Sequence, residues 1–375
     1  MHRRTFLKTT GVAALNTLVL AGSNRGTPRK TGLKNWTWIP TDTRRSSDDW
    51  KRQFALMRQH GIQAILPEIY NGQSAFFTST RLPVDSDWLG QILPLAKAEE
   101  LEVHAWMWSM PCMLKEILSN HPDWYNVNAN GESAATKPAY VDYYKFLDPG
   151  RPEVREFVQG TVKELARIPE LTGIHLDYIR YPDAILPHGL WSKYKIVQDK
   201  IYPQYDYGYS EYERNRFKEK YGVDPLQLKD PNSNLDWVKF RLDSVVDLVN
   251  NYLVPAAHAQ GKMITAAVFP GPSLARQRVR QDWGRFQLDA FLPMLYSAFY
   301  EKGPEWVRKE TEEAVAATDR PIYSGIFVNG MDGTTFSKTL WMAIEGGASG
   351  VSIFSADSMG QSKWMALQKI TRPTN

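Results

Sequence analysis

Short apolar runs alternate with amphipathic helical patterns along most of the chain. The apolar runs are at residues 35–39, 64–70, 102–108, 173–178, 263–269, 290–295, 321–328 and 350–354. The helical patterns lie between and after them, at residues 48–60, 87–99, 151–167, 211–221, 236–258, 304–317, 337–345 and 361–369. This alternation is typical of a parallel sheet covered by helices. Eight such units over about 340 residues predict an α/β protein with a (β/α)₈ TIM barrel.

Two long segments interrupt the alternation after the third and fourth strands, at residues 109–147 and 182–210. Both are rich in aromatic and polar residues. Because the functional site of such a barrel lies at the C-terminal ends of its strands, we expect both segments to form walls over the same mouth. An open doubly wound sheet is the structural alternative. The sequence has no Gly-x-Gly-x-x-Gly or Walker-type loop after its early strands, which disfavours the common nucleotide-binding versions of that fold.

The N-terminal segment has the features of an export signal. Residues 2–8 read His-Arg-Arg-Thr-Phe-Leu-Lys, and a mild apolar stretch follows at residues 11–21. This order resembles a twin-arginine signal. The apolar stretch is too short for a stable membrane span. We therefore predict a signal and linker at residues 1–27, a single barrel domain at residues 28–375, and a periplasmic or extracellular protein without stable membrane insertion.

Composition narrows the possible partners. The formal net charge is +4 without a basic stripe, so we expect no nucleic-acid partner. Cys112 is the only cysteine, which excludes an internal disulfide and a cysteine-based metal cluster. The chain contains 13 Trp and 18 Tyr, which favours a groove for flat amphipathic ligands such as sugar rings. Packing between helices and barrel is the alternative role for these aromatic residues.

The fourth predicted strand ends in a motif that concentrates polar side chains. Residues 171–183 read Leu-Thr-Gly-Ile-His-Leu-Asp-Tyr-Ile-Arg-Tyr-Pro-Asp. Because alternate residues of a barrel strand face the interior, His175 and Asp177 share the inner face. Arg180 is close enough in sequence to pair with Asp177 and hold it ionised, and an ionised carboxylate suits an oxocarbenium-like transition state. The alternative is a structural network of these three side chains that seals the top of the barrel.

This motif resembles a strand of the bacterial glycoside-hydrolase-like family 10, a group of exported TIM-barrel enzymes. Further segments resemble the family in order along about residues 34–355, namely 103–106, 121–124, 130–131, 147–155, 217–222, 237–241, 281–283 and 292–296. The resemblance implies a glycoside hydrolase that cleaves O-glycosidic bonds in a polysaccharide or a peptidoglycan glycan strand, without a cofactor. Family members often carry an Arg and then Gly-Asp-Ala-x-Tyr after the second strand. Here that Arg and Asp are missing, and Glu68 is present instead.

Glycoside hydrolysis normally uses two carboxyl groups, one of them protonated. Glu68 is our first candidate for the partner of Asp177, because its apolar neighbours in sequence would raise its pKa into the range of a general acid. A salt bridge from Glu68 to Arg81 or Arg180 is the alternative. Asp282 is the second candidate, in a loop after the fifth strand, where a capping or purely structural role is the alternative.

The remaining polar and aromatic residues near the strand ends are candidates for binding the substrate. They are His104, Trp106, Trp108, Trp124, His175, Tyr178, Arg180, Tyr181, Trp283 and Tyr296. Two histidines and a carboxylate form a known metal ligand set, but no helical His-x-x-x-His spacing supports one here, and we predict no metal. A carbohydrate-binding barrel without catalysis and a metal-dependent polysaccharide deacetylase are the competing functions.

Overall fold

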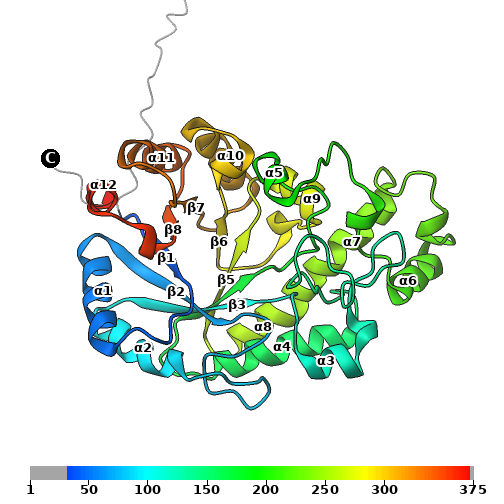
Figure 1. The fold of residues 1–375 in the computed structure, drawn as a ribbon, viewed down its shortest axis with the longest axis horizontal. Coiled ribbons are helices and arrows are strands. Elements are labelled where there is room, and N and C mark those ends of the chain that lie inside the picture. The colour runs from blue at the N-terminus through cyan, green and yellow to red at the C-terminus, as the bar shows by residue number, and fades with distance from the viewer. Residues whose placement is uncertain (1–31, 372–375) are drawn as a thin grey trace, which may run out of the picture. The chain divides into compact units, whose positions relative to one another are not determined.

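The computed structural model describes residues 32–371, so the predicted export signal lies outside the described residues. Eight parallel strands form a barrel (Figure 1). Their hydrogen-bonded order is β6-β5-β4-β3-β2-β1-β8-β7. Backbone hydrogen bonds from Phe291 to Pro321 (3.1 Å) and from Leu295 to Gly325 (2.8 Å) join β6 to β7 at the remaining edge. The predicted TIM barrel is therefore confirmed. The strands are β1 (Asn35–Ile39), β2 (Ile62–Tyr70), β3 (Glu102–Trp108), β4 (Gly173–Asp177), β5 (Met263–Val268), β6 (Ala290–Pro293), β7 (Tyr323–Phe327) and β8 (Gly350–Phe354).

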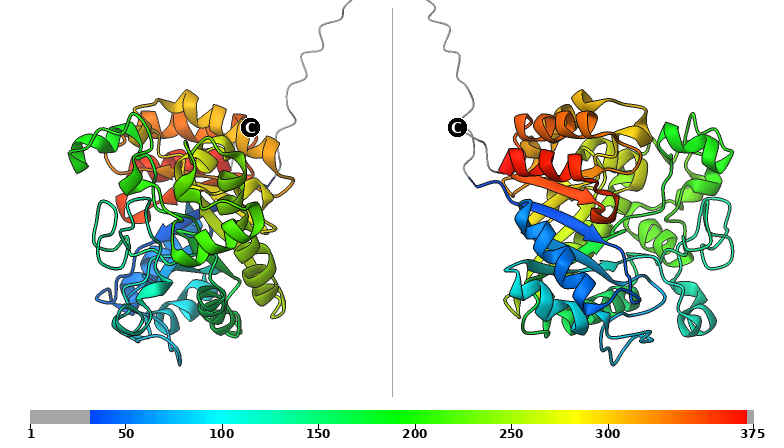
Figure 2. Two further views of the ribbon diagram at one scale, coloured as in Figure 1. Left: turned by 90° about the vertical axis from the view of Figure 1, so that its right-hand side faces the viewer. Right: turned by 60° about the vertical axis from the view of Figure 1, so that its left-hand side comes forward.

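The helices surround the strands, as Figures 1 and 2 show. They are α1 (Ser47–Gln59), α2 (Trp88–Ala98), α3 (Lys115–Asn120), α4 (Pro152–Ala166), α5 (Trp191–Tyr194), α6 (Glu211–Tyr221), α7 (Leu235–Asp247), α8 (Val254–His258), α9 (Pro272–Val279), α10 (Pro304–Ala317), α11 (Gly333–Glu345) and α12 (Gln361–Thr371). None of the described helices is both long and apolar enough to cross a membrane.

Three features of these helices differ from the sequence prediction. The helix expected at residues 236–258 contains a π-helical segment, Leu248–Leu253, between α7 and α8. The helix expected to begin at residue 337 begins at Gly333, because the Asp332 carboxylate accepts hydrogen bonds from the backbone N–H groups of Thr334 and Thr335 (both 2.9 Å). The short helices α3, α5 and α9 were not predicted, since each spans only about one or two turns within a longer connecting segment.

Side chains alternate between two cores along the strands, as the pleat requires. One set fills the barrel interior and is dominated by bulky aromatic residues on β1 and β3, including Trp36, Trp38 and Trp106. The other set faces outward and packs under the helices; Ile65 on β2 and Ile174 on β4 belong to it, and both are fully buried. The wide indoles inside the barrel bring polar N–H groups into its interior, and these groups require acceptors.

The two predicted long segments after β3 and β4 are present, and they contact one another. Asn128 and Tyr207 form an antiparallel bridge between them. The Asn126 side-chain oxygen accepts a hydrogen bond from the Gly208 backbone N–H (2.8 Å). In Figure 1 these segments, coloured cyan-green to green, lie on the same side of the strands. They therefore extend the barrel beyond the ends of β3 and β4.

Candidate active site

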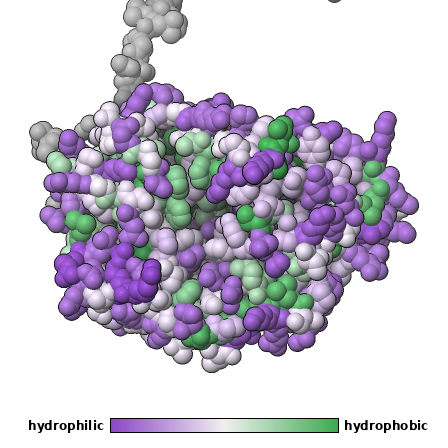
Figure 3. Space-filling model, viewed as in Figure 1, coloured by the Kyte–Doolittle hydropathy of each residue, from purple (hydrophilic) through white to green (hydrophobic). Residues whose placement is uncertain are grey.

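A pocket of about 340 Å³ lies at the C-terminal ends of the strands. Residues from strands and from both long segments line it, and apolar side chains dominate its surface. In Figure 3 the molecule is hollowed where Figure 1 draws β6 and β7, with hydrophobic surface inside a mainly hydrophilic rim. Seven of the predicted site residues line this pocket, namely Glu68, Trp106, Trp108, Asp177, Tyr178, Arg180 and Tyr296.

Asp177 is the last residue of β4, and its carboxylate is held by two donors. The Trp106 Nε1–H donates to Oδ2 (3.1 Å), and the Tyr178 backbone N–H donates to Oδ1 (2.7 Å). Only 8% of the residue is exposed. Burial raises the pKa of Asp177 to about 6, and the two hydrogen bonds and the charge of Arg180 limit the rise. The carboxyl group is therefore able to exchange a proton close to neutral pH.

Tyr178 places one of these donors by adopting an unusual backbone conformation. Its φ is 53°, in the left-handed region that residues with a Cβ seldom occupy. This turn directs the Tyr178 N–H back to the carboxylate that precedes it. Strain of this kind persists where the surrounding structure enforces it, often at functional sites. The Tyr178 ring lines the pocket and packs against Trp108, with ring centroids 5.0 Å apart.

Glu68 near the end of β2 has a matching environment. The Trp108 Nε1–H donates to its Oε1 (2.8 Å), and the Thr41 hydroxyl donates to its backbone oxygen (2.6 Å). Burial raises the pKa of the Glu68 carboxyl, and the charge of Asp177 raises it further. The predicted rise in the Glu68 pKa is confirmed in direction. The alternative of a salt bridge is wrong, because Arg81 lies beside Phe157 and Gly160 on α4 and Arg180 pairs with Asp183.

Strand β3 lies between β2 and β4, which carry the two carboxyl groups, and it provides a hydrogen-bond donor to each group. Glu68 is opposite Trp106 in the pairing of β2 with β3, and Asp177 is opposite Trp108 in the pairing of β3 with β4. Each indole reaches the carboxylate on the other neighbour, since Trp106 donates to Asp177 and Trp108 donates to Glu68. Both side chains therefore turn toward the same strand. The charge of Asp177 also raises the pKa of Glu68.

Arg180 has a different partner from the predicted one. Its Nη1 donates to the Asp183 carboxylate (2.9 Å) and to the Tyr181 backbone oxygen (2.9 Å). The prediction of a direct Arg180–Asp177 pair is wrong, because the loop after β4 turns Arg180 toward Asp183. Arg180 acts on Asp177 only through its charge, which lowers the Asp177 pKa against the larger effect of burial.

The pocket has aromatic walls that sequence reasoning largely missed. Trp38 on β1 and Phe354 at the end of β8 line it, and both could have been found as inward or strand-end residues. Tyr144, Tyr194 and Phe299 also line it. Tyr144 lies in an irregular segment and the other two lie in helical segments of four residues, which are too short to give a periodic signal. Tyr296, which was predicted, stacks on Phe354 with ring centroids 6.0 Å apart.

One wall joins two loop segments that are distant in sequence. The 3₁₀ segment His188–Leu190 after β4 lies against the 3₁₀ segment Ser297–Tyr300 after β6. A Cβ on Gly189 would lie 2.8 Å from the Ala298 backbone oxygen, so only glycine permits this close approach. On the outside, the His188 Nδ1 lies 2.7 Å from the Glu301 carboxylate. These contacts hold the two 3₁₀ segments together and so stabilise the pocket wall that contains Leu190 and Phe299.

The two histidines predicted to bind substrate lie inside the barrel below the pocket. The Trp38 Nε1–H donates to the His175 Nε2 (3.0 Å), and the His175 Nδ1 lies 2.9 Å from the Thr265 hydroxyl. His104 is paired with Gly173 at the start of β4 and contacts Glu102 (3.2 Å). Burial lowers the pKa of both imidazoles. Both predictions are therefore corrected, because each ring is fully buried and is not part of the pocket lining.

Three predicted sugar-facing aromatic residues also lie outside the pocket lining. Trp283 is fully buried, and its Nε1–H donates to the Phe269 backbone oxygen (3.1 Å). Tyr181 is 1% exposed. Trp124 stacks on His121, with ring centroids 4.3 Å apart, in the segment after β3. The structure therefore contradicts a substrate-binding role for the buried Trp283 and Tyr181, whereas the half-buried Trp124 is only absent from the pocket lining.

Asp282 is not brought to the pocket either. Its carboxylate pairs with Arg276 (3.3 Å) and with Arg285 (3.4 Å). These pairs hold the segment between α9 and β6, so the structural alternative for Asp282 is correct and the catalytic prediction is wrong. Cys112 is buried and is not part of the pocket lining.

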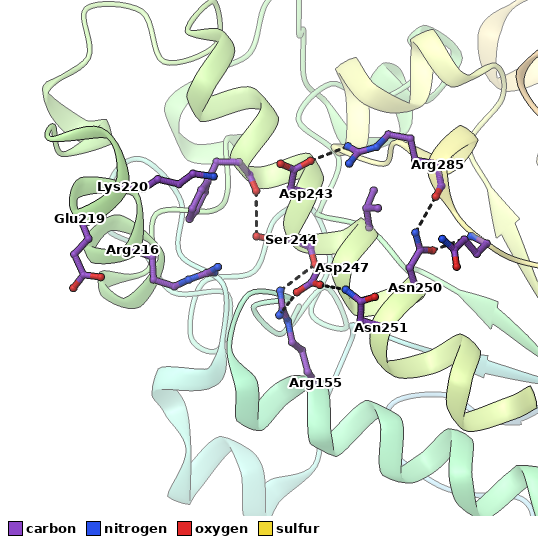
Figure 4. Close-up of a pocket in the computed structure, with 13 residues that line it drawn as sticks. Arg155, Arg216, Glu219, Lys220, Asp243, Ser244, Asp247, Asn250, Asn251 and Arg285 are labelled. Atoms are coloured by element: carbon purple, nitrogen blue, oxygen red, sulfur yellow. Dashed lines mark hydrogen bonds and ion pairs between the residues drawn. The ribbon is translucent and has the colours of Figure 1, made fainter. Parts of the chain in front are cut away.

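A second pocket, of about 670 Å³, lies beside α6, α7 and the π-helical segment (Figure 4). Four of its charged side chains form two ion pairs, Arg155 with Asp247 and Arg285 with Asp243 (2.7 Å). Burial alone would raise the pKa of Asp243, but the hydrogen bonds from Lys239 and Arg285 lower it overall. The pKa of Asp243 is therefore shifted in the opposite direction to that of Asp177.

The metal alternative requires His104, His175 and Asp177 to converge, and they do not. His104 is level with the first residue of β4, whereas Asp177 is its last residue. Both ring nitrogens of His175 face Trp38 and Thr265. Within residues 32–371 there is no cluster of three or more His, Cys, Asp or Glu side chains with the geometry to hold a metal ion.

Comparison with known proteins agrees with this architecture. Residues 51–187 match the family described as glycosyl hydrolase-like 10, which confirms the resemblance drawn from the sequence over this part of the chain. The matched range includes β2, β3 and β4, and with them Glu68 and Asp177. No curated protein matches the chain.

Solved structures share the fold at low identity. The catalytic domain of a β-amylase from Paenibacillus polymyxa is 13% identical with a TM-score of 0.61, over 89% of this chain and 95% of that one. A β-galactosidase from Marinomonas ef1 is 14% identical with a TM-score of 0.65, over 90% of this chain and 59% of that one. An α-L-fucosidase isoenzyme from Paenibacillus thiaminolyticus is 13% identical with a TM-score of 0.55, over 91% of this chain and 49% of that one. These similarities concern the barrel fold.

Proposed function

We propose that this barrel, with its match to the glycosyl hydrolase-like 10 family, is a glycoside hydrolase that cleaves O-glycosidic bonds in a polysaccharide or a peptidoglycan glycan strand. The observation that carries the proposal is the pair of carboxyl groups at the mouth of the barrel. Asp177 and Glu68 both line the pocket, both have raised pKa values, and each accepts an indole N–H from β3. Two carboxyl groups with different protonation states are what acid/base cleavage of a glycoside requires.

The electrostatics favour a division of roles between the two groups. Asp177 has two hydrogen-bond donors and the charge of Arg180, which stabilise its ionised form against burial. The charge of an ionised Asp177 in turn adds to the effect of burial in raising the pKa of Glu68. Glu68 is thus assigned as the general acid that protonates the leaving oxygen. Asp177 is assigned as the nucleophile or as the base that activates water, opposite an oxocarbenium-like transition state.

The aromatic walls suit a carbohydrate ligand. A ring stacked on a sugar buries apolar C–H surface and leaves the hydroxyl groups free to form hydrogen bonds. Trp108, Tyr178 and Tyr296 line the pocket beside the two carboxyl groups. We assign these three residues to substrate binding. The twin-arginine-type segment at residues 2–21 supports a further proposal, that the protein acts in the periplasm or outside the cell.

A product assay tests the proposed function. The full-length protein, Asp177→Asn and Glu68→Gln are incubated with a panel of neutral and acidic polysaccharides and with peptidoglycan stripped of its peptides. Mass spectrometry of the products is expected to show fragments with the wild type and at most traces with either variant. Equal fragment release by wild type and Asp177→Asn would refute the catalytic assignment. Glycan binding by the wild type without any fragments would favour the carbohydrate-binding barrel instead.

A further inference from the structure

The charges that line the mouth pocket are unbalanced. Glu68, Asp177 and Asp183 contribute three carboxyl groups. Among the described residues that line the pocket, Arg180 is the only positively charged side chain, and neither lysine nor histidine is present. A ligand group that enters the pocket therefore meets carboxyl groups and apolar rings, with a single guanidinium as counter-charge.

Arg180 already forms an ion pair with Asp183, which neutralises its charge. The Arg180 Nη1 lies 2.9 Å from the Asp183 Oδ2, and the two side chains are only 5% and 4% exposed. The Tyr144 hydroxyl donates to the same Asp183 oxygen (3.0 Å) and holds it in place. Aromatic rings cover the guanidinium, with the Phe269 centroid at 5.0 Å and the Tyr178 centroid at 5.1 Å. A buried pair in such geometry has little attraction left for a second anion.

If Asp183 did not neutralise it, the Arg180 side chain could bind an anion from the pocket. Its buried Nε–H has no hydrogen-bond partner among the described residues. The guanidinium is also close enough for its charge to lower the pKa of Asp177. Without Asp183, the same guanidinium would present an uncompensated positive charge and a free donor beside the proposed catalytic pair. Planar guanidinium groups bind carboxylates well in such positions.

We propose that Asp183 is a specificity-determining residue, which neutralises Arg180 and thereby restricts the pocket to glycosyl units without a carboxylate, such as neutral hexoses and N-acetylhexosamines. This inference rests on the proposed function of the same pocket. A uronic acid unit, or any unit that bears an acidic substituent, is disfavoured because it would place a further carboxylate among Glu68, Asp177 and Asp183 without a free cation. In an acidic glycan, the unit held in this pocket is therefore an uncharged one.

Calorimetric titration with matched ligands tests the proposal. The probes are α-1,4- and β-1,4-linked glucose tetrasaccharides, the corresponding N-acetylglucosamine tetrasaccharide, and the glucose tetrasaccharides oxidised to the 6-carboxyl form. For the wild-type full-length protein, we expect at least one neutral probe to bind at least about 10-fold more tightly than its carboxylated counterpart. For Asp183→Asn, we expect this ratio to fall to about one or to invert, because the amide keeps the shape and the Tyr144 contact but releases the Arg180 charge.

Asp224→Asn is the matched control. Asp224 also forms an Asp–Arg ion pair, with Arg214, but this pair is outside the pocket lining. Its loss should leave the ratio of affinities unchanged. Equal or tighter binding of a carboxylated probe by the wild type would overturn the proposal, as would a complete lack of tetrasaccharide binding. A wild-type preference for neutral probes well below 10-fold overturns the proposal even if Asp183→Asn does not fold.

The two proposals fail in different ways. Selective binding of neutral probes without cleavage by mass spectrometry would refute the hydrolase function and leave the selectivity of the pocket intact. Cleavage of carboxylated and neutral tetrasaccharides at similar rates would refute the role of Asp183 and leave the hydrolase function intact.

Discussion

Replacement of Trp106 by Phe removes the indole N–H that Asp177 accepts and retains an aromatic ring in its place. The pKa of Asp177 is about 6, raised by burial and limited by two hydrogen bonds and the charge of Arg180. A hydrogen bond to a charged group contributes about 1.5–3 kcal/mol, and one pKa unit corresponds to about 1.4 kcal/mol. Loss of the Trp106 donor should therefore raise the pKa of Asp177 to about 7 or 8.

This change has a clear consequence for the pH profile. The ionised fraction of Asp177 at pH 7 falls from about nine-tenths to a half or less when its pKa rises from about 6 to 7 or above. The acidic limb of kcat/KM should move to higher pH by the same amount, because the proposed reaction needs Asp177 ionised. Trp108→Phe should instead raise the pKa of Glu68 and move the alkaline limb to higher pH, since this indole donates to Glu68.

Carboxyl ¹³C NMR measures the same pKa without a substrate. The Asp177 resonance is assigned by its loss in Asp177→Asn and titrated in the wild type, in Trp106→Phe and in Trp283→Phe. The last variant is the control, since it also removes a buried indole N–H, but one that donates to the backbone oxygen of Phe269. An Asp177 titration that is the same in wild type and Trp106→Phe would refute the assigned role of the Trp106 indole.

Three further changes test other parts of the account. Glu68→Gln should lower kcat by roughly 10²- to 10⁴-fold without loss of thermal stability, as measured by initial rates and calorimetry, because it removes only the general acid; a smaller loss would exclude that role. Burial, and then the charge of Asp148, raise the pKa of Glu213 to about 8. The folded state therefore holds a proton that the unfolded state releases, and the free energy of unfolding falls as pH rises from about 4.5 to 8. Glu213→Gln should make Tm decline less over this pH range, and an unchanged decline would contradict the assignment. Gly150→Ala would place a Cβ 1.2 Å from the Glu213 carboxylate, and urea denaturation should show a loss of stability of about 1–3 kcal/mol. Gly360→Ala is the control and should leave the stability unchanged, because a Cβ added there meets no described atom within 4 Å.

Periodicity in the sequence was sufficient to predict the barrel and the edge that carries its site. Each predicted strand corresponds to an observed one, because buried parallel strands are continuous apolar runs. The rule that barrel sites lie at the C-terminal strand ends then identified Glu68 and Asp177. Both residues combine an acidic side chain with a strand-end position, and this combination is visible without a structure.

Periodicity could not predict depth along a strand. His104 shares the inward face with Trp106, but it lies one inward position earlier, where the barrel is filled and closed to solvent. Trp283 is an aromatic residue in a loop, yet packing against Phe291 buries it completely. Tertiary contacts decide such positions, so aromatic composition alone overestimated the number of residues that face a ligand.

The partner of Arg180 was also beyond the reach of sequence reasoning. Arg180 lies three residues from Asp177 and three residues from Asp183, so spacing favours neither carboxylate. The backbone turn at Tyr178 decides between them, since it directs the N–H of that residue to Asp177, while the loop beyond it brings Arg180 to Asp183. A loop conformation of this kind leaves no periodic signal in the sequence.

The central claim is that Asp177 and Glu68 act together on a glycosidic bond. The most direct test compares product release by the wild type, Asp177→Asn, Glu68→Gln and the double variant, on the glycan that the wild type degrades fastest. Residues that act as one unit are strongly non-additive, so each single variant should lose nearly as much activity as the double variant. If the losses of the single variants instead multiply to give the loss of the double variant, or if either single variant retains full turnover, the paired mechanism is contradicted.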